Sequence, residues 1–329
     1  MNIAFFETEG WEEPILKQAF PDDEIATFPG RLTAETLPDK RDFEVVSAFM
    51  DSPVNPELAK QFPSLGLVTT RSTGYDHIDV KGLANMGIKT GYVPGYGDNT
   101  VAEFAFALIL NLTRRVYAAI DQIKERESFD KAGLRGIDLK GKIMGVVGTG
   151  RIGREFIRMA KGFGMDVIAS DPRPSDAAAK ELGFVYVSFE ELLKRADAIS
   201  FHCPYMPSTH HILNKENIAL LKKGVYIVNT ARGAVLETDA LVAGLQSGVI
   251  AGLGLDVLEE ENEVKDEVNL VRGGTLSREA MNVVLEDHIL MKMPNVLITP
   301  HVAFDSWEAV HRILDITIRN IKAFTAVVP

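Results

Sequence analysis

The stretch KIMGVVGTGRIG, residues 142–153, decides the fold of the larger part of this chain. A short β-rich run leads into the pattern G-x-G-x-x-G, and the residues that follow, REFIRMAKGFG, have the composition of a helix. In such a turn Gly148 permits the tight bend, Gly150 lets the backbone approach a pyrophosphate, and Gly153 allows the helix to pack close to the strand. The amino end of the helix offers unpaired N–H groups and a partial positive charge to phosphates. We therefore predict a strand–turn–helix unit that binds a dinucleotide.

A carboxylate at the end of the next predicted strand indicates which dinucleotide is bound. Asp171 follows Gly148 by about 23 residues, close to the spacing of roughly 20 at which an acidic residue reaches the adenosine ribose. A carboxylate binds ribose hydroxyls, whereas a 2′-phosphate at about 4 Å would cost roughly 4 kcal/mol for each unit of like charge. We expect NAD in preference to NADP, with residual NADP use if Arg173 offsets the repulsion. The other interpretation of Asp171 is a turn cap, because Pro172 follows it.

The rest of the chain repeats the rhythm of a short β-rich run followed by a helical stretch. Most of the runs are continuously apolar, which is typical of parallel strands covered by helices on both faces. The predicted strands are 3–6, 45–49, 67–70, 143–147, 167–170, 198–202, 225–229, 251–256 and 296–299, and the predicted helices include 152–163, 189–195 and 238–246. This alternation predicts an α/β fold with doubly wound parallel sheets of the Rossmann type.

Two features predict that the chain forms two domains and returns to the first. The tract VPGYGD at 93–98 interrupts the alternation, and one long helical pattern follows over about 100–125. The segment 306–324 is an amphipathic helix with no strand of its own to cover, so we expect it to pack back on the first domain. The predicted boundaries are 1–98 plus 301–329 for a discontinuous substrate domain and 99–300 for the dinucleotide-binding domain. A length of 329 residues also fits two domains better than one.

Composition excludes several classes of protein. Acidic residues outnumber basic ones by 46 to 35, which argues against a nucleic-acid-binding protein. The sequence has no apolar run of about 18 residues, so we expect no membrane span, and its first residues do not resemble a secretory signal. The single cysteine, Cys203, excludes an internal disulfide, fits a reducing cytoplasm and lies in an apolar run that predicts a small buried side chain. We expect no metal site, since His210 and His211 are adjacent and point in different directions.

Three further side chains follow predicted strands and together fit the reduction of a 2-keto acid. Arg232 comes just after strand 225–229, at the edge where the carboxyl ends of parallel strands meet, and its planar guanidinium suits a carboxylate. His301 follows strand 296–299, and Glu261 closes a run of three glutamates. A carboxylate beside an imidazole stabilises the imidazolium and fixes its tautomer, so the histidine can act as general acid in reduction and general base in oxidation.

Each of these side chains also has a plain structural interpretation when it is taken alone. Arg232 could cap a helix, His301 could be a loop histidine, and an acidic triplet is usually a solvated face. Their combination with the dinucleotide-binding unit favours a redox site. We therefore predict a NAD-dependent oxidoreductase that passes hydride between nicotinamide and a small 2-keto or 2-hydroxy acid.

Seven segments extend the pattern over most of the chain. They are RSTGYDHID (71–79), VPGYGDNTVAEFAFALIL (93–110), VVGTGRIG (146–153), HCPYMPSTHHILN (202–214), VNTARGAVLETDAL (228–241), GLGLDVLEEE (252–261) and PNVLITPHVAF (294–304). In this order they resemble the D-isomer-specific 2-hydroxyacid dehydrogenase family, and specifically its D-lactate dehydrogenase-like branch. The resemblance implies an active-site cleft between the two domains and a homodimer that forms through the helix at about 100–125.

The resemblance also implies a role for each site residue. Arg232 would bind the substrate carboxylate and carbonyl, Asp256 would contact the nicotinamide carboxamide, and His301 would be the proton donor. The catalytic glutamate lies five positions after that aspartate, which selects Glu261 from the triplet. The substrate-binding residues implied are Thr73 and Gly74, through their backbone N–H groups, with Tyr96 and Phe304 as pocket walls. The cofactor-binding residues implied are Gly148, Thr149, Gly150, Arg151, Ile152, Gly153, Asp171, His202, Cys203, Pro204, Thr209, Thr230, Ala231, Asp256 and Ala303.

Two departures from the lactate branch concern the substrate. Asp305 stands where lactate enzymes tend to carry an aromatic residue, and Asp51 and Ser52 lie where that branch tends to carry a tyrosine near the pocket. Both would admit a larger or more polar side chain than the methyl group of pyruvate. The length of the stretch from Glu261 to His301 nevertheless favours the lactate branch over members resembling phosphoglycerate dehydrogenase.

Two alternatives therefore stand beside a D-lactate dehydrogenase. Within the same class, a glyoxylate, hydroxypyruvate or phosphoglycerate oxidoreductase, or an enzyme that oxidises phosphite or formate, would share the cofactor site. From another class, an NAD-sensing binding protein, as some corepressors resembling this family are, would use the dinucleotide to stabilise a dimer with a peptide cleft. The complete set of Arg232, Glu261 and His301 weakens that second alternative.

Overall fold

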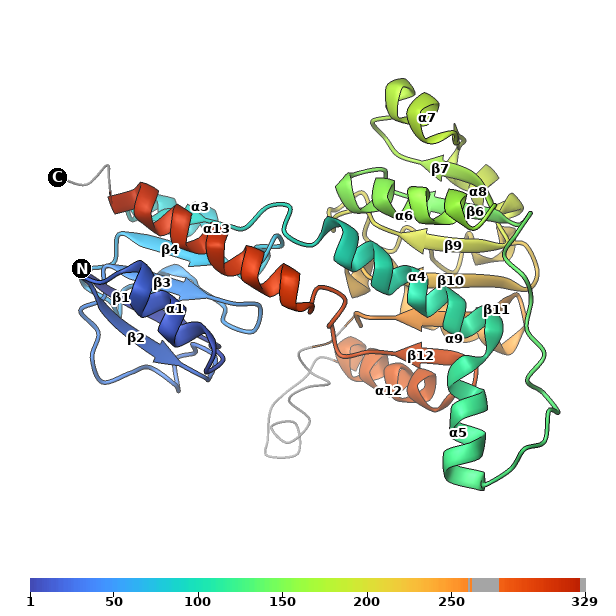
Figure 1. Cartoon of the computed structure of the whole chain (residues 1–329), viewed down its shortest axis with the longest axis horizontal. Helices are drawn as coiled ribbons and strands as arrows, with labels where there is room; N and C mark the ends of the chain where they lie inside the picture. The colour runs from blue at the N-terminus through green and yellow to red at the C-terminus, as the bar shows by residue number, and fades with distance from the viewer. Residues whose placement is uncertain (260, 262–277, 326–329) are drawn as a thin grey trace. The chain divides into compact units, whose positions relative to one another are not determined.

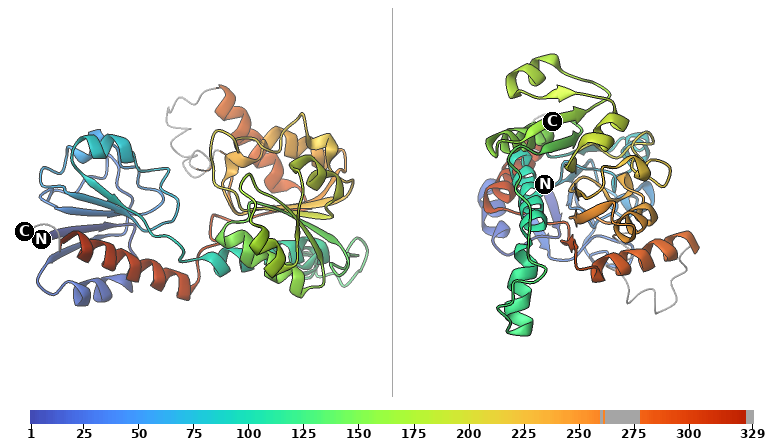
Figure 2. Two further views of the ribbon diagram at one scale, coloured as in Figure 1. Left: turned by 90° about the horizontal axis from the view of Figure 1, so that it is seen from above. Right: turned by 90° about the vertical axis from the view of Figure 1, so that its right-hand side faces the viewer.

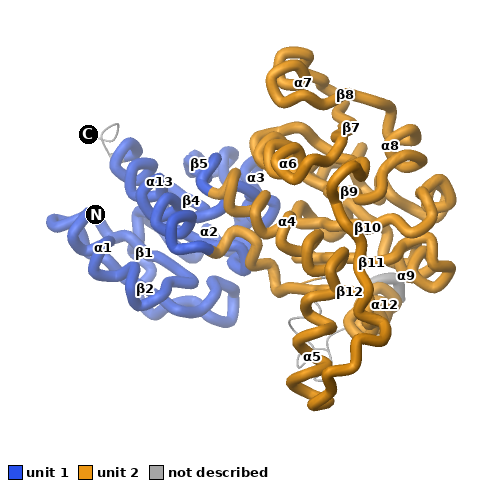
Figure 3. Tube along the Cα trace, turned by 45° about the vertical axis from the view of Figure 1, so that its right-hand side comes forward, with its two compact units in different colours: residues 1–96, 306–329 blue, residues 97–305 orange. Residues whose placement is uncertain are grey.

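The computed structural model describes residues 1–259, 261 and 278–325 (Figure 1). The chain divides into two compact units (Figure 3). Unit 1 is Met1–Tyr96 with the segment from Ser306 onward, and unit 2 is Gly97–Asp305. Each unit has a parallel sheet covered by helices on both faces, which confirms the predicted α/β fold class.

Unit 1 contains a five-stranded parallel sheet in the order β2-β1-β3-β4-β5. Its strands are β1 (Asn2–Phe6), β2 (Glu24–Phe28), β3 (Val45–Ala48), β4 (Leu67–Thr70) and β5 (Lys89–Gly91). The strand order reverses between β1 and β3, as in doubly wound folds. The sequence prediction missed β2 and β5. Both are edge strands with partly exposed side chains, so they lack the continuous apolar run that marks a buried strand.

The two faces of this sheet have separate cores. Along β1, Ile3 and Phe5 pack with side chains of α1 (Glu12–Ala19) and α13 (Trp307–Thr325). Ala4 and Phe6 point to the opposite face, which is covered by α2 (Pro56–Ala59) and α3 (Val80–Asn85). Helix α13 lies about 300 residues after β1 in the chain, yet its buried residues complete the first of these cores (Figure 1). The fold of unit 1 therefore needs both ends of the sequence.

Unit 2 contains a seven-stranded parallel sheet in the order β12-β11-β10-β9-β6-β7-β8. Its strands are β6 (Ile143–Val147), β7 (Asp166–Ser170), β8 (Val185–Tyr186), β9 (Ala198–Phe201), β10 (Val225–Asn229), β11 (Ile250–Leu255) and β12 (Val296–Ile298). From β6 the chain first builds outward through β7 and β8, then returns and builds the other way from β9. The order thus reverses between β6 and β9, and ligands of such sheets bind outside the carboxyl ends of the strands at this point.

Helices cover both faces of the second sheet. One face packs on α4 (Asp98–Arg114), α6 (Arg151–Gly162) and α7 (Asp176–Leu182). The other packs on α8 (Phe189–Arg195), α9 (Thr238–Gln246) and α12 (Arg278–Lys292). Apolar residues on both sides of each central strand are therefore buried, which explains why these strands are apolar without interruption.

The prediction of one helix over about 100–125 is wrong. The structure has two helices, α4 and α5 (Val116–Arg126), separated by Arg115 in the left-handed conformation with φ 52°. The side chain of Asn111 accepts the N–H group of Tyr117 across the break at 2.8 Å. Helix α4 is buried against the sheet and α6, whereas α5 buries no residue and projects from the rest of unit 2 (Figures 1 and 2). The break thus falls where the packing surface ends.

We predict that Ile321→Ala lowers the free energy of unfolding of unit 1 by about 2–5 kcal/mol, because Ile321 is fully buried between α13 and the sheet. Both tryptophans of the chain, Trp11 and Trp307, belong to unit 1, so urea unfolding followed by tryptophan fluorescence reports on this unit. Asp315→Ala, at an exposed position of the same helix, is the matched control. Superimposable unfolding curves for the two variants would contradict this packing.

Candidate active site

The glycine turn lies at the reversal of strand order in unit 2, directly after β6. Gly148 has φ +92°, and a Cβ atom there would lie 2.8 Å from the backbone nitrogen of Cys203. A Cβ atom at Gly153 would lie 2.1 Å from the carbonyl oxygen of Gly148. At Gly150, by contrast, a Cβ atom would meet nothing within 4 Å. Two glycines are therefore required by the protein's own packing, and the third leaves open space beside the amino end of α6.

This geometry fits a dinucleotide. The open space at Gly150 adjoins the first turn of α6, whose N–H groups suit a pyrophosphate. The hydroxyl oxygen of Thr230, a predicted cofactor residue, is buried and has no hydrogen-bond partner among the described residues. A bound polar group would satisfy it. Arg151 is exposed and pairs with Asp98 at 2.6 Å, so its side chain is held at the surface beside α4.

Asp171 ties the glycine turn to the end of β7. One carboxylate oxygen accepts the N–H and hydroxyl groups of Thr149 at 2.7 and 3.0 Å, and the other accepts the N–H group of Arg173 at 2.8 Å. The hydroxyl of Thr149 also lies 2.8 Å from that of Tyr186. Asp171 therefore makes the contacts expected of a turn cap, which was the other interpretation of this residue. Its contact with the adenosine ribose stays a prediction.

The segment after β9 borders the same turn. Burial lowers the pKa of His202 to about 3, so its imidazole is neutral at physiological pH, with Nε2 2.9 Å from Ser200 Oγ. Burial raises the pKa of the Cys203 thiol to about 11, which leaves about one thiolate in a thousand at pH 8. The predicted buried cysteine is therefore confirmed. The hydroxyl of Thr209 donates to the carbonyl oxygen of Pro204 at 2.7 Å and closes the turn that follows.

Three strands place the other candidate residues at one edge of the sheet. Arg232 follows β10, Asp256 follows β11 and His301 follows β12, and these strands are adjacent and parallel. Because neighbouring strands lie about 4.8 Å apart, the ends of β10 and β12 are separated by roughly 10 Å. Arg232 and His301 therefore follow strands that end at the same edge of the sheet, two strands apart.

Asn229 positions the loop that carries Arg232, and sequence reasoning did not single it out. This fully buried side chain donates to the carbonyl oxygen of Arg232 at 2.8 Å and accepts the N–H group of Ala231 at 3.0 Å. The Arg232 guanidinium in turn donates to the carbonyl oxygen of Ala231 at 2.7 Å. The sequence did contain a signal for this role, because Asn229 is a polar residue at the end of an apolar strand.

Asp256 joins the loop after β12 to the end of β11. Its carboxylate accepts hydrogen bonds from the Thr299 hydroxyl at 2.5 Å, from the Val302 N–H at 3.0 Å and from the Ala303 N–H at 2.8 Å. Burial raises its pKa, and these three hydrogen bonds oppose the shift. Asp256 is only 1% exposed, and its carboxylate holds the loop after β12 in place. Its contact with the nicotinamide stays a prediction.

His301 and Glu261 form the central pair of the site. The Nδ1 atom of His301 lies 3.1 Å from each carboxylate oxygen of Glu261. His301 has φ 55°, a left-handed conformation that is uncommon outside glycine. With Nδ1 directed at the carboxylate, Nε2 is the nitrogen that can take up and release a proton. Both side chains keep about a fifth of their surface exposed, so the pair remains accessible to a ligand.

Glu259, two residues before Glu261, has a different structural role. Glu259 accepts the N–H and hydroxyl groups of Thr238 at 3.2 and 2.8 Å, at the amino end of α9, and pairs with His211. It therefore caps a helix, whereas Glu261 faces the imidazole. Glu260 lies outside the described residues.

The residues predicted to bind substrate are divided between the units. In unit 1, Thr73 is exposed and donates its hydroxyl to the carbonyl oxygen of Val93 at 2.7 Å, and Gly74 is half-buried. Tyr96 is buried, and its carbonyl oxygen accepts Arg312 Nε at 2.6 Å. In unit 2, Phe304 is half-buried. Among the residues predicted to bind the cofactor, Ile152 and Ala231 are half-buried and Ala303 is buried.

Comparison with known proteins identifies the family. Residues 106–303 match the family model described as D-isomer specific 2-hydroxyacid dehydrogenase, NAD binding domain. The chain belongs to the D-isomer-specific 2-hydroxyacid dehydrogenase family. A D-lactate dehydrogenase of Escherichia coli is 34% identical over 98% of this chain and 96% of its own length. An aromatic 2-oxoacid reductase of Clostridium sporogenes is 36% identical over 86% of this chain and 83% of its own. A solved D-lactate dehydrogenase from Aquifex aeolicus, complexed with NAD and lactic acid, is 35% identical and covers 99% of this chain and 96% of its own, with a TM-score of 0.87.

Family membership makes this chain an NAD-dependent D-2-hydroxyacid dehydrogenase with NAD as its cofactor. Among the described residues, no cluster of histidine, cysteine or carboxylate side chains could hold a metal ion. None of the helices in the described part of the chain has the length and apolar character needed to cross a membrane.

We predict that Gly150→Ala weakens NADH binding at least about tenfold without changing the melting temperature. The new methyl group would meet no protein atom within 4 Å, yet it would occupy the space next to the first turn of α6. Gly162→Ala, which also meets nothing within 4 Å but lies at the other end of α6, is the matched control. Titration of each protein with NADH, followed by fluorescence, measures the dissociation constant. Equal affinity of the two variants would show that the dinucleotide does not approach Gly150.

Proposed function

We propose that this dehydrogenase interconverts pyruvate and D-lactate, with His301 as the acid and base, Glu261 as its partner and Arg232 as the carboxylate-binding residue. The observation that carries the proposal is the position of His301 Nδ1 at 3.1 Å from both oxygens of Glu261. This contact fixes the orientation and tautomer of the imidazole and leaves Nε2 for the substrate. Proton transfer by a positioned side chain accelerates such reactions by about 10²–10⁴-fold.

The residues divide the work of reduction between them. Bound NADH supplies the hydride that reaches C2 of the keto acid. Arg232, held by Asn229 at the end of β10, binds the substrate carboxylate, for which a planar guanidinium is suited. His301 donates the proton from Nε2 to the carbonyl oxygen, so that C=O becomes CH–OH, and recovers it in the reverse direction. We also assign the backbone N–H groups of Thr73 and Gly74 to the substrate carboxylate.

The remaining cofactor contacts follow the same proposal. The glycine turn would hold the pyrophosphate, Asp171 the ribose, and the segment His202 to Thr209 with Thr230 would line the rest of the dinucleotide site. The single thiol, Cys203, is buried, and the chain contains no second cysteine for an internal disulfide. This cysteine content supports a cytoplasmic location.

The size of the substrate side chain depends partly on residues 51 and 52. Ser52 is fully buried and bonded to Glu7 and to the N–H group of Leu32, so its hydroxyl is committed inside unit 1. Ser52 therefore does not itself offer a hydrogen-bonding group to a substrate, which fits an apolar substrate side chain. An aromatic keto acid is the second candidate, because the aromatic 2-oxoacid reductase is similar to this chain over 86% of it.

We predict the highest kcat/KM for pyruvate in a series of keto acids that also contains 2-ketobutyrate, glyoxylate, hydroxypyruvate and phenylpyruvate. A missing or added methylene changes binding by only about 1–3 kcal/mol, so the neighbouring substrates should still react. NADH oxidation measures turnover, and chiral chromatography of the lactate formed identifies the isomer. L-lactate as the product, or turnover of phenylpyruvate far above that of pyruvate, would contradict the pyruvate assignment.

We predict that His301→Ala lowers kcat by about 10²–10⁴-fold while the dissociation constant of NADH changes little. Glu261→Gln should lower kcat to a smaller extent, because an amide can also present its NH2 group to Nδ1 and no longer fixes the tautomer of the imidazole. Glu259→Gln removes the same charge two positions away, where the side chain caps α9, and serves as the control. Stopped-flow measurement of NADH oxidation gives both constants. Similar rates for the two glutamine variants would remove Glu261 from the mechanism.

We further propose a homodimer that forms through α5. Val116, Ile120 and Ile123 lie on one face of this helix at 44%, 47% and 47% exposure, and α5 buries none of its residues within the chain. An exposed apolar stripe on a projecting helix is typical of a protein interface. A second copy of the chain is the partner that the family resemblance implies.

Analytical ultracentrifugation tests this interface. We predict that the wild-type chain sediments as a dimer and that Ile120→Asp shifts it toward the monomer. Val185→Asp replaces another exposed apolar residue of unit 2, far from α5 in sequence, and should remain dimeric. A dimer that withstands Ile120→Asp would place the interface elsewhere.

A further inference from the structure

A chain of hydrogen bonds in unit 1 ends on the turn that follows β4. The Nε2 atom of His77 lies 2.9 Å from Thr70 Oγ1, which lies 2.7 Å from Ser72 Oγ. The Ser72 hydroxyl donates to the carbonyl oxygen of Gly74 at 2.6 Å. Thr70 and Ser72 are buried at 0% and 3% exposure, so the middle of this chain is shielded from solvent. The mechanism described above does not use His77.

The number of hydroxyl protons decides the direction of each hydrogen bond. A carbonyl oxygen only accepts, so the proton of Ser72 must point to Gly74. The contact between Thr70 and Ser72 then needs the proton of Thr70, since the hydroxyl of Ser72 has no other. With its single proton used there, Thr70 can only accept from His77. The Nε2 atom of His77 must therefore carry a proton.

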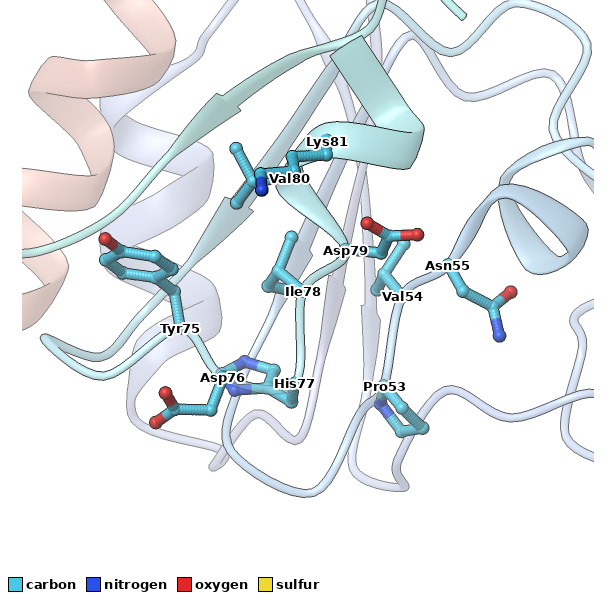
Figure 4. Close-up of a pocket in the computed structure, with 10 residues that line it drawn as sticks. All are labelled: Pro53, Val54, Asn55, Tyr75, Asp76, His77, Ile78, Asp79, Val80 and Lys81. Carbon is cyan, nitrogen blue, oxygen red and sulfur yellow. The ribbon is translucent and has the colours of Figure 1, made fainter. Parts of the chain in front are cut away.

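The turn is also fixed on its other side. The Thr73 hydroxyl donates to the carbonyl oxygen of Val93 at 2.7 Å, and the N–H group of Val93 donates to the carbonyl oxygen of Ser72 at 3.0 Å. The backbone of His77 is anchored in turn, because its carbonyl oxygen accepts the N–H group of Val54 at 2.9 Å. An open hollow of about 550 Å³ lies beside the turn, and His77 and Val54 are among the residues that line it (Figure 4). His77 thus connects a rigid part of unit 1 to Gly74.

We propose that His77 is a positioning residue for the substrate carboxylate. Its Nε2–H group donates into a chain that ends at the Gly74 carbonyl oxygen and fixes the peptide plane between Gly74 and Tyr75. The Val93 N–H group fixes the plane between Ser72 and Thr73, which carries the Thr73 N–H group. The peptide plane that carries the Gly74 N–H group lies between these two fixed planes, so both N–H groups keep the orientation that we assign to carboxylate binding. The inference rests on the proposed function, which assigns these N–H groups to the substrate.

Steady-state kinetics of His77→Leu and His77→Gln test this role. Leucine removes the donor, whereas the glutamine amide can donate from a similar position. We expect His77→Leu to raise KM for pyruvate about tenfold, with kcat and the dissociation constant of NADH within about twofold of wild type. His77→Gln should recover most of the affinity. His311→Leu, an exposed histidine of the same unit, should match wild type. Equal KM values for the leucine and glutamine variants would overturn the proposal.

A double-variant cycle distinguishes this chain from a general loss of structure. Ser72→Ala breaks the same chain at its last link, so His77→Leu combined with Ser72→Ala should raise KM no further than Ser72→Ala alone. Multiplicative effects of the two changes would mean that His77 and Ser72 act separately, against the proposal.

Nitrogen-15 NMR of the labelled wild-type protein tests the donor directly, and it requires neither a folded variant nor turnover. We expect the His77 Nε2 resonance of a protonated ring nitrogen. An unprotonated Nε2 would overturn this inference alone. Absence of wild-type turnover with every keto acid of the series would instead overturn the proposed function, and with it the substrate role of the turn.

Discussion

The hydrogen bonds to the buried carboxylate of Asp256 hold the candidate site of unit 2 together. Three groups of the loop after β12 donate to it, and in sequence they lie on both sides of His301. They hold His301 in a left-handed conformation that costs about 1–2 kcal/mol in a residue with a side chain. The imidazole is thereby directed at Glu261 by contacts within the protein. A general acid that is oriented in advance needs no reorganisation during the reaction.

Unit 1 uses a comparable device at the ends of its own strands. Glu7, also left-handed at φ 54°, follows β1, and its carboxylate accepts the N–H groups of Phe49 and Asp51 at 3.1 and 3.0 Å. The buried guanidinium of Arg71, which follows β4, donates to the carbonyl oxygens of Phe6 and Glu7 at 2.8 and 2.6 Å. The ends of three strands are thus connected beneath the loops that follow them. In both units, buried charged groups at the carboxyl edge fix the loops, while the apolar sheet supplies the stability.

The central elements were predictable from sequence because one simple physical constraint acts on each. The strands Ile143–Val147 and Val225–Asn229 and the helix Thr238–Gln246 have the predicted bounds, since burial on both faces or on one face leaves a clear apolar pattern. The edge strands and the break at Arg115 were missed because their positions depend on where the packing surface of the neighbouring elements ends. The local sequence does not show where that surface ends.

The sequence indicated which residues are candidates for the site, but it did not indicate most of the hydrogen bonds that these residues make. Arg232 and His301 were found because polar side chains directly after apolar strands meet at one edge of a parallel sheet. The family resemblance selected Glu261 over Glu259, and the structure gives the two glutamates different partners, His301 and Thr238. The orientation of Ser52 and the bonds of Asn229 depend on residues distant in sequence, so three-dimensional packing decides them.

The position of the proton donor is the central claim, and a crystal structure of the enzyme with NADH and oxamate tests it most directly. Oxamate has the shape and charge of pyruvate but resists reduction. We expect His301 Nε2 to lie within about 2.6–3.2 Å of the oxamate carbonyl oxygen, and the oxamate carboxylate to bind the guanidinium of Arg232. A structure in which another side chain contacts that oxygen, or in which His301 turns away from Glu261, would contradict it.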